Sequence, residues 1–319
     1  MSPVTLTAKG KRREDFAKEI LDTLENGVSN FYSSAEWKSF LEYNSKFHNY
    51  SINNRILMML QNPTATQVAS MTTWNKLGRS VIAGQGALGM KILAPKICNI
   101  EEYKLDPAGK RIIGEDGKPE IEKVKKVVGF LPVSVYDISQ THGKPVQTLD
   151  LELSGSSDKK EDIISALEDI TNIKFVYENI DKAYGYFNKT DRKIALKTDV
   201  SDVQTIKTAI HETAHFLLHD VDAPQELADR QTKEIQAESV AFTVCNRIGI
   251  DTGDYSFGYI GAWAANKDLN VMRQNIDIIC NTADEIAGGI EKQFEKSRQK
   301  ASEFISSATE LSDDNEPDI

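Results

Sequence analysis

The sequence predicts an α+β protein of two domains, and three observations lead to this fold class. Residues 11–60 repeat apolar side chains at helical spacing, whereas residues 67–140 contain short strand-like runs separated by glycines. Residues 154–162, SGSSDKKED, have the composition of a linker between domains. At 319 residues the chain is long enough to give each half its own hydrophobic core.

Three helices are predicted in the first sixty residues. The first ends at Gly27 and has apolar side chains on one face: Phe16, Ile20, Leu21 and Leu24. The second, at residues 35–47, brings together a further apolar set: Trp37, Phe40, Leu41 and Tyr43. The third begins at Ser51, which is a suitable N-cap, and ends before Pro63.

The segment that follows is predicted to form a short helix and then a sheet. Residues 101–127 are polar and rich in Gly and Pro, so we expect an exposed hairpin inserted between two strands of one sheet. The N-terminal domain is therefore expected to cover residues 1–153, and a second domain residues 154–290. Residues 291–319 are expected to begin as a helix and end in a disordered acidic tail.

Composition narrows the class of protein. No apolar run approaches the roughly 18–20 residues that a membrane span needs, and the first residues lack the apolar core of a secretory signal. We therefore expect a cytoplasmic protein without a membrane partner. The three cysteines, Cys98, Cys245 and Cys280, are too scattered for a disulfide framework or a CxxC pair.

The charges are unevenly distributed. The whole chain carries a net charge of −10, yet no Asp or Glu occurs between Glu42 and Glu101, a stretch that contains six cations. Within it, Trp74, Lys76 and Arg79 fall within six residues, and an aromatic beside cations is typical of a surface that binds single-stranded nucleic acid. The alternative for each residue alone is a structural role, with Trp74 in the core. The missing carboxylates favour a partner that carries phosphates.

The second half contains a pattern typical of a metal site. A helix predicted to start at the Ser201 cap places His211 and His215 one turn apart on the same face, with Glu212 beside them. This is the HExxH arrangement of zinc peptidases, in which two histidines bind zinc and the glutamate is the general base. The alternative is that these are ordinary helix histidines. The apolar residues around them indicate a buried helix, which favours neutral, metal-bound imidazoles.

A second predicted helix offers a third ligand. It carries Glu234 and Glu238 one turn apart, and helix geometry permits either carboxylate to complete the set. Two histidines and one carboxylate leave a coordination position open for water, as catalytic zinc requires.

The runs YGYFNKTDRKIALKTD, HETAHFLLHD and KEIQAESVAF resemble the gluzincin-like peptidases of the ImmA/IrrE type. The resemblance implies zinc as the cofactor, Glu238 as its third ligand, Glu234 as an outer partner of the ligands and Glu212 as the base. His219 matches a recurrent histidine of this family, with a supporting role. Tyr184, Tyr186 and His219 are candidate oxyanion donors, and residues 192–197 are expected to be the edge strand on which a peptide substrate docks.

The N-terminal half also resembles a known family. N-x-x-L, W-x-x-LG-x-x-V-x-x-G, KILAP and VYDISQT are similar to the single-stranded-DNA-binding domain of ArdC-type antirestriction proteins, which precedes a zinc metallopeptidase-like domain. The two resemblances together cover roughly residues 10–280. The motif positions imply four DNA contacts, Asn54, Trp74, Arg79 and Lys91. Composition adds Tyr50, Arg55 and Lys76. The sequence departs from the family in its longer GQGALGMKI turn and in the insert at 101–127.

The function implied is protection of incoming conjugative DNA from host restriction, with single-stranded DNA and a protein substrate as partners. One alternative is a regulatory metallopeptidase of a mobile element that cleaves a repressor. Another is a DNA-binding protein whose zinc is purely structural.

Overall fold

The structure is a computed structural model, and it describes residues 3–6, 11, 13–27, 33–146, 157–220, 228–251, 257, 260–264 and 267–313. The chain divides into two units: unit 1 contains residues 1–27 and 56–145, and unit 2 contains residues 28–55 and 146–319. The fold is a mixed α+β fold, as the sequence predicts. The segment 28–55 differs from expectation, since it groups with the C-terminal unit.

Unit 1 contains two antiparallel sheets and three helices. Its helices are α1 (Arg13–Gly27), the part of α3 (Ile52–Gln61) that begins at Ile56, and α4 (Met71–Lys76). Its strands are β1 (Val68–Ser70), β2 (Arg79–Val81), β3 (Met90–Tyr103), β4 (Ile121–Asp137) and β5 (Thr141–Gly143). The strand order is β1-β4-β3 in one sheet and β2-β5 in the other.

The core of unit 1 lies between α1 and the inner part of the β1-β4-β3 sheet. Phe16, Ile20 and Leu24 are buried, whereas Leu21 is 47% exposed, so the apolar stripe of α1 is narrower than the sequence pattern suggests. Trp74 is buried beside β4, and its indole Nε1 donates a hydrogen bond of 2.9 Å to the Tyr136 carbonyl. This bond satisfies the indole donor inside the core.

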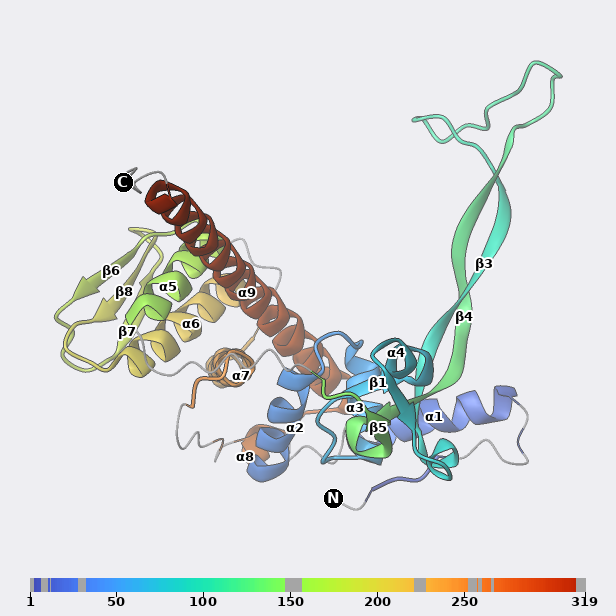
Figure 1. The fold of residues 1–319 in the computed structure, drawn as a ribbon, viewed down its shortest axis with the longest axis horizontal. Coiled ribbons are helices and arrows are strands. Elements are labelled where there is room, and N and C mark those ends of the chain that lie inside the picture. The colour runs from blue at the N-terminus through green and yellow to red at the C-terminus, as the bar shows by residue number, and fades with distance from the viewer. Residues whose placement is uncertain are drawn as a thin grey trace, which may run out of the picture. The chain divides into compact units, whose positions relative to one another are not determined.

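β3 and β4 form a long two-stranded ribbon that extends away from the rest of unit 1 (Figure 1). Its register runs from Met90 opposite Val135 to Tyr103 opposite Ile121, with an irregularity between Pro95 and Ile97. The inner pairs are buried and the outer pairs exposed. The expected hairpin at 101–127 thus consists of the outer ends of both strands and their connection.

The inner end of β3 is closed on its free edge by a glutamine side chain. The Gln61 amide accepts a 2.8 Å hydrogen bond from the Lys91 backbone N–H and donates one of 2.9 Å to the Lys91 carbonyl. Both backbone groups that a neighbouring strand would pair with are therefore already occupied by α3.

Unit 2 is mostly helical. Its helices are α2 (Ser34–Lys46), α5 (Ser157–Thr171), α6 (Asp202–His219), α7 (Arg230–Arg247), α8 (Ile260–Ala264) and α9 (Leu269–Asp313). Residues 157–162, assigned to a linker by composition, are the first turns of α5. The acidic tail at 314–319 lies outside the described residues, as do residues 147–156.

Specific side-chain contacts explain why α2 belongs to unit 2. Trp37 of α2 is fully buried, and its indole Nε1 donates a 3.0 Å hydrogen bond to the Ser239 hydroxyl of α7. Helix α7 is joined in turn to α9, because the Arg247 guanidinium of α7 donates two hydrogen bonds to the Glu291 carboxylate of α9, 2.8 and 2.6 Å long. These contacts join segments more than 40 residues apart, so local composition does not reveal them.

A small sheet completes unit 2. Its strands are β6 (Phe175–Glu178), β7 (Gly185–Asn188) and β8 (Lys193–Lys197), in the order β6-β8-β7. β8 is parallel to β6 and antiparallel to β7. The expectation that residues 192–197 form an edge strand is therefore wrong: β8 is central, because it pairs on both sides, and β7 is an edge. Among the described helices of the chain, none has the length and apolarity to cross a bilayer.

Candidate metal centre

Helix α6 begins and continues as the sequence predicts. The Ser201 hydroxyl accepts a 3.2 Å hydrogen bond from the Gln204 backbone N–H, which caps the first turn. One side of the helix is buried in unit 2 through Ile206, Ala209, Ile210, Ala214 and Leu218. The packing of that side fixes the direction in which the remaining side chains project.

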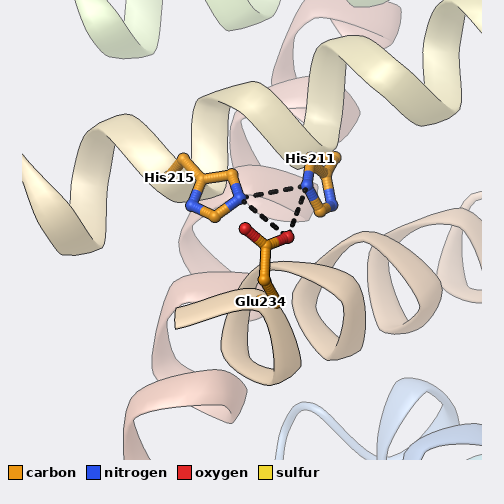
Figure 2. Close-up of side chains that lie close together, drawn as sticks. All are labelled: His211, His215 and Glu234. Carbon is orange, nitrogen blue, oxygen red and sulfur yellow. Dashed lines mark hydrogen bonds and ion pairs between the residues drawn. The ribbon is translucent and has the colours of Figure 1, made fainter. Parts of the chain in front are cut away.

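His211 and His215 lie on the side of α6 that faces α7. Their Nε2 atoms are 3.0 Å apart. The Glu234 Oε2 atom of α7 lies 3.8 Å from the His211 Nε2 and 3.6 Å from the His215 Nε2. Figure 2 shows the three side chains, which come from two helices, pointing toward one another. Helix α7 starts just before Glu234, where the Asp229 carboxylate caps it with a 2.7 Å hydrogen bond from the Thr232 N–H.

These three atoms fit a divalent metal ion. For bonds of about 2.0–2.1 Å to a tetrahedral ion, ligand atoms are about 3.3 Å apart. The three separations here, 3.0, 3.6 and 3.8 Å, are close to that value. The nearby His215 ring and the charges of both histidines lower the pKa of Glu234, despite its partial burial, which favours the ionised carboxylate that a metal ligand must be.

Glu238 is placed differently from the expectation. Its Oε2 atom lies 3.3 Å from the Nδ1 of His211, the nitrogen that faces away from His215 and Glu234. Its Oε1 atom lies 3.7 Å from the Lys207 ammonium. In this arrangement Glu234 lies with the imidazole pair, and Glu238 lies behind the His211 ring, the reverse of the placement that the family resemblance implies. The physical reason is that α7 packs against α6 with Glu234, which lies one turn before Glu238, next to the two Nε2 atoms.

The protonation of His211 follows from this arrangement. Burial acts to lower its pKa, but the Glu238 carboxylate 3.3 Å from its Nδ1 and the charges of Glu212 and Glu234 outweigh burial and raise it. A carboxylate behind a ligand histidine fixes the orientation of the ring and increases its basicity.

Glu212 lies in the wall of a cavity of about 720 Å³, beside the histidine pair. Burial raises the pKa of its carboxyl group, against the charges of His211 and His215 and a hydrogen bond with the Phe187 backbone. Strand β7 forms another wall through Gly185, Tyr186 and Phe187. A carboxylate with a raised pKa next to a metal site is suited to take up a proton.

Of the other residues expected near the site, His219 and Tyr186 line the cavity, whereas Tyr184 does not. His219 lines the cavity, and its ring centroid is 5.5 Å from that of His215. Burial and the neighbouring His215 lower its pKa to about 4, so it is neutral at pH 7. Tyr186 also lines the cavity, but its hydroxyl donates a 2.7 Å hydrogen bond to Glu178. Tyr184 is 55% exposed.

Three of the seven residues predicted to bind DNA are buried. Arg55 is 2% exposed and is held by the Asn44 side chain, by two backbone carbonyls and by Asp284. Asn54 is also buried, and Trp74 has the core position described above. The structure thus places these three side chains, which were predicted to bind DNA, in the interior.

The other four residues predicted to bind DNA differ in exposure and in hydrogen bonding. Lys76 is exposed and Tyr50 is half-buried. Arg79 joins β2 to β5, since its guanidinium donates to the side-chain hydroxyl and carbonyl of Thr141. The Lys91 ammonium donates a 2.6 Å hydrogen bond to the Ser134 hydroxyl, and burial lowers the pKa of Lys91. Tyr50, Asn54 and Arg55 belong to unit 2, so the predicted set is divided between the units.

One aromatic side chain was missed by the sequence reasoning. Phe130 is 61% exposed. The β3–β4 register places six side chains on one face of the ribbon, which we call the solvent face: Lys91, Leu93, Pro95, Phe130, Pro132 and Ser134. A signal was present in the sequence, because Leu131, Val133 and Val135 alternate with Phe130, Pro132 and Ser134.

Comparisons with known proteins give a family for the N-terminal part. Residues 11–131 match the family ArdcN, the N-terminal domain of anti-restriction factor ArdC. A Bacillus anthracis protein described as uncharacterized is 26% identical, over 92% of this chain and 56% of the relative, so the chain spans about half the length of that curated relative. Two crystal structures of the antirestriction ArdC protein from plasmid R388 are also similar. The metal-free one is 19% identical with a TM-score of 0.45, covering 78% of this chain and 86% of that one. The Mn(II)-bound one is 17% identical with a TM-score of 0.46, covering 87% and 96%.

Proposed function

We propose that this chain, whose residues 11–131 form an ArdC-type N-terminal domain, binds single-stranded DNA and is a zinc-dependent peptidase that protects incoming conjugative DNA from restriction. The observation that carries the enzymatic part is the convergence of His211, His215 and Glu234 on one point beside Glu212. The N-terminal domain match and the acid-free stretch support the DNA-binding part.

Zinc is the metal that the donor set favours. Two imidazoles and one carboxylate are the protein ligands of a common class of catalytic zinc sites. His211, His215 and Glu234 would hold the ion, and Glu238 would hold the His211 ring. When bound, the ion supplies Lewis-acid chemistry for peptide hydrolysis. Glu212 contributes the group that takes up and returns a proton.

Strand β7 supports a peptide as the substrate. It is at the edge of its sheet, it lines the cavity, and its Phe187 backbone faces Glu212. An edge strand offers unpaired N–H and C=O groups with which an extended peptide forms an additional strand. The docking strand is therefore proposed to be β7 in place of residues 192–197.

The solvent face of the β3–β4 ribbon supports binding of single-stranded DNA. It carries the exposed ring of Phe130 and the cation of Lys91 on the same side. Base stacking on an aromatic ring together with cations along the backbone gives binding that does not depend on sequence. Lys76 adds an exposed cation in the same unit.

The proposal is tested by plasmid transfer between bacteria. Conjugation frequencies are measured into a restricting recipient and into an isogenic recipient without restriction, with the wild-type chain, Glu212→Gln or no chain expressed. We expect the wild-type chain to raise transfer only into the restricting recipient. Equal transfer with and without the chain would contradict the antirestriction role. If Glu212→Gln protects as well as the wild type, protection does not depend on proteolysis, and the peptidase part of the proposal fails for this role.

A further inference from the structure

The cavity beside the metal site has one end lined by cations. Lys189, Arg230 and Lys233 all line it, together with His215 and His219, and we call these three residues the basic end. This end lies next to the C-terminus of α6, because the Lys189 ammonium donates a 2.9 Å hydrogen bond to the carbonyl of His219, the last residue of α6. Arg230 and Lys233 lie in the first turn of α7, beside Glu234.

The basic end is unusual within its half of the chain. Residues 151–319 carry 18 Lys and Arg against 32 Asp and Glu. Many cations of unit 2 accordingly have carboxylate partners: Arg55, Lys160, Lys174, Lys189, Arg192, Lys193, Lys207, Arg247 and Lys267. Lys189 of the basic end is thus paired with Asp220, and Arg230 and Lys233 are the two cations of that end outside this set. Within the part of the chain that the structure describes, the side chains of Arg230 and Lys233 make no hydrogen bond or close ion pair, although the charge of Arg230 helps to lower the pKa of Glu234.

Cations left without partners in an acid-rich unit indicate an anionic ligand. Their charges attract an anion toward the cavity that they line. A guanidinium and an ammonium are the donors that bind carboxylates with charge-assisted hydrogen bonds. The wall formed by the edge strand β7 favours a peptide over a nucleic acid as the molecule that carries the anion.

We propose that the basic end, through Arg230 and Lys233, selects peptides with an Asp or Glu side chain adjacent to the peptide bond held at the metal site. The proposal deepens the peptidase function and rests on it, since it names the class of substrate for the same cavity. It assigns to the two cations a role in substrate selection, separate from metal binding and from proton transfer.

The experiment measures peptide binding apart from turnover. Two fluorescent libraries of capped nonapeptides are prepared, identical and random except for a fixed central Glu in one and a fixed central Gln in the other. Each library is titrated by fluorescence anisotropy against full-length Glu212→Gln protein loaded with zinc. We expect the Glu library to bind about tenfold more tightly than the Gln library, with a preference that declines as salt is added.

Charge variants assign the preference to residues. Arg230→Gln/Lys233→Gln, in the Glu212→Gln background, is expected to remove the preference. Lys296→Gln is the matched control, because it removes an exposed cation of α9 that does not line the cavity, and it is expected to keep the preference. Zinc content and the thermal midpoint of each variant show whether its fold and metal site are intact.

Several outcomes would overturn the proposal. These are equal binding of the two libraries, no binding of either, or an unchanged preference in the double variant. A third arm uses a 12-nucleotide oligodeoxythymidine as competitor: displacement of the Glu library from the wild-type cavity but not from the double variant would identify a phosphodiester as the ligand instead. Cleavage of the libraries by the protein with Glu212 intact tests the peptidase function separately, so the two failures are distinguishable.

Discussion

The α6–α7 pair and the β3–β4 ribbon differ in how they hold the side chains that we propose to bind metal and DNA: the first holds them between packed helices, and the second exposes them to solvent. His211 and His215 project from a helix whose other side is buried, and the carboxylates of a second packed helix limit their movement. Phe130 stands on a two-stranded ribbon with 61% of its surface exposed. Metal binding requires several ligand atoms at fixed separations, and two packed helices provide these. Stacking on a flexible strand of DNA tolerates a mobile base, so a single ring on a ribbon is sufficient.

The largest expected effect concerns the ligands on α7. Glu234→Gln is expected to weaken zinc affinity by more than about 100-fold, because it removes a ligand, whereas Glu238→Gln is expected to weaken it about 10- to 100-fold, as loss of an outer partner does. Both are measured by competition with a chromophoric chelator, with His215→Ala as the reference for a lost ligand. A larger loss for Glu238→Gln than for Glu234→Gln would restore the roles implied by the family resemblance.

The next effect concerns Arg55, a residue predicted to bind DNA that the structure places in the interior. Arg55→Leu is expected to lower the free energy of unfolding by about 2–3 kcal/mol, because Asp284 and several buried acceptors lose their donor. Urea unfolding of the full chain measures this loss. Lys46→Leu, which replaces an exposed cation of the same unit, is expected to change it by less than about 0.5 kcal/mol. An Arg55 variant of unchanged stability that had lost DNA affinity would contradict the structural role.

The smallest effect concerns the solvent face of the ribbon. Phe130→Leu is expected to weaken binding of a labelled oligodeoxythymidine about tenfold, because leucine retains the apolar bulk but provides no ring for stacking. Phe130→Tyr is the matched control and is expected to bind like the wild type. Fluorescence anisotropy at two salt concentrations measures both. Equal affinity of the Leu and Tyr variants would show that the ring does not contact bases.

The sequence predicts features that depend on contacts within one helix or strand, and it does not predict those that depend on contacts between distant elements. The spacing of His211 and His215 is set within one helix, so four residues of separation were enough to place both imidazoles on one side. The choice between Glu234 and Glu238 depends on how α7 is rotated and shifted against α6, which no local pattern records. The order of β7 and β8 depends in the same way on pairing in the folded sheet.

The DNA-binding residues show the same limit more strongly. Composition marked Arg55 as a surface cation because no carboxylate is near it in sequence, yet its partner Asp284 is 229 residues away. The sequence likewise predicts that Trp74 stacks on bases, whereas its buried indole N–H donates a hydrogen bond to the Tyr136 carbonyl. A count of charges in a stretch of sequence does not distinguish a buried cation with a distant partner from one that meets solvent.

The Gln61 amide that pairs with Lys91 has a consequence for assembly. Uncapped strand edges allow sheets of different molecules to join, and that joining leads toward aggregation. By mimicking one residue of a neighbouring strand, this single side chain terminates the sheet at the inner end of β3. Any intermolecular strand that pairs with this edge of β3 must therefore end before it reaches Lys91.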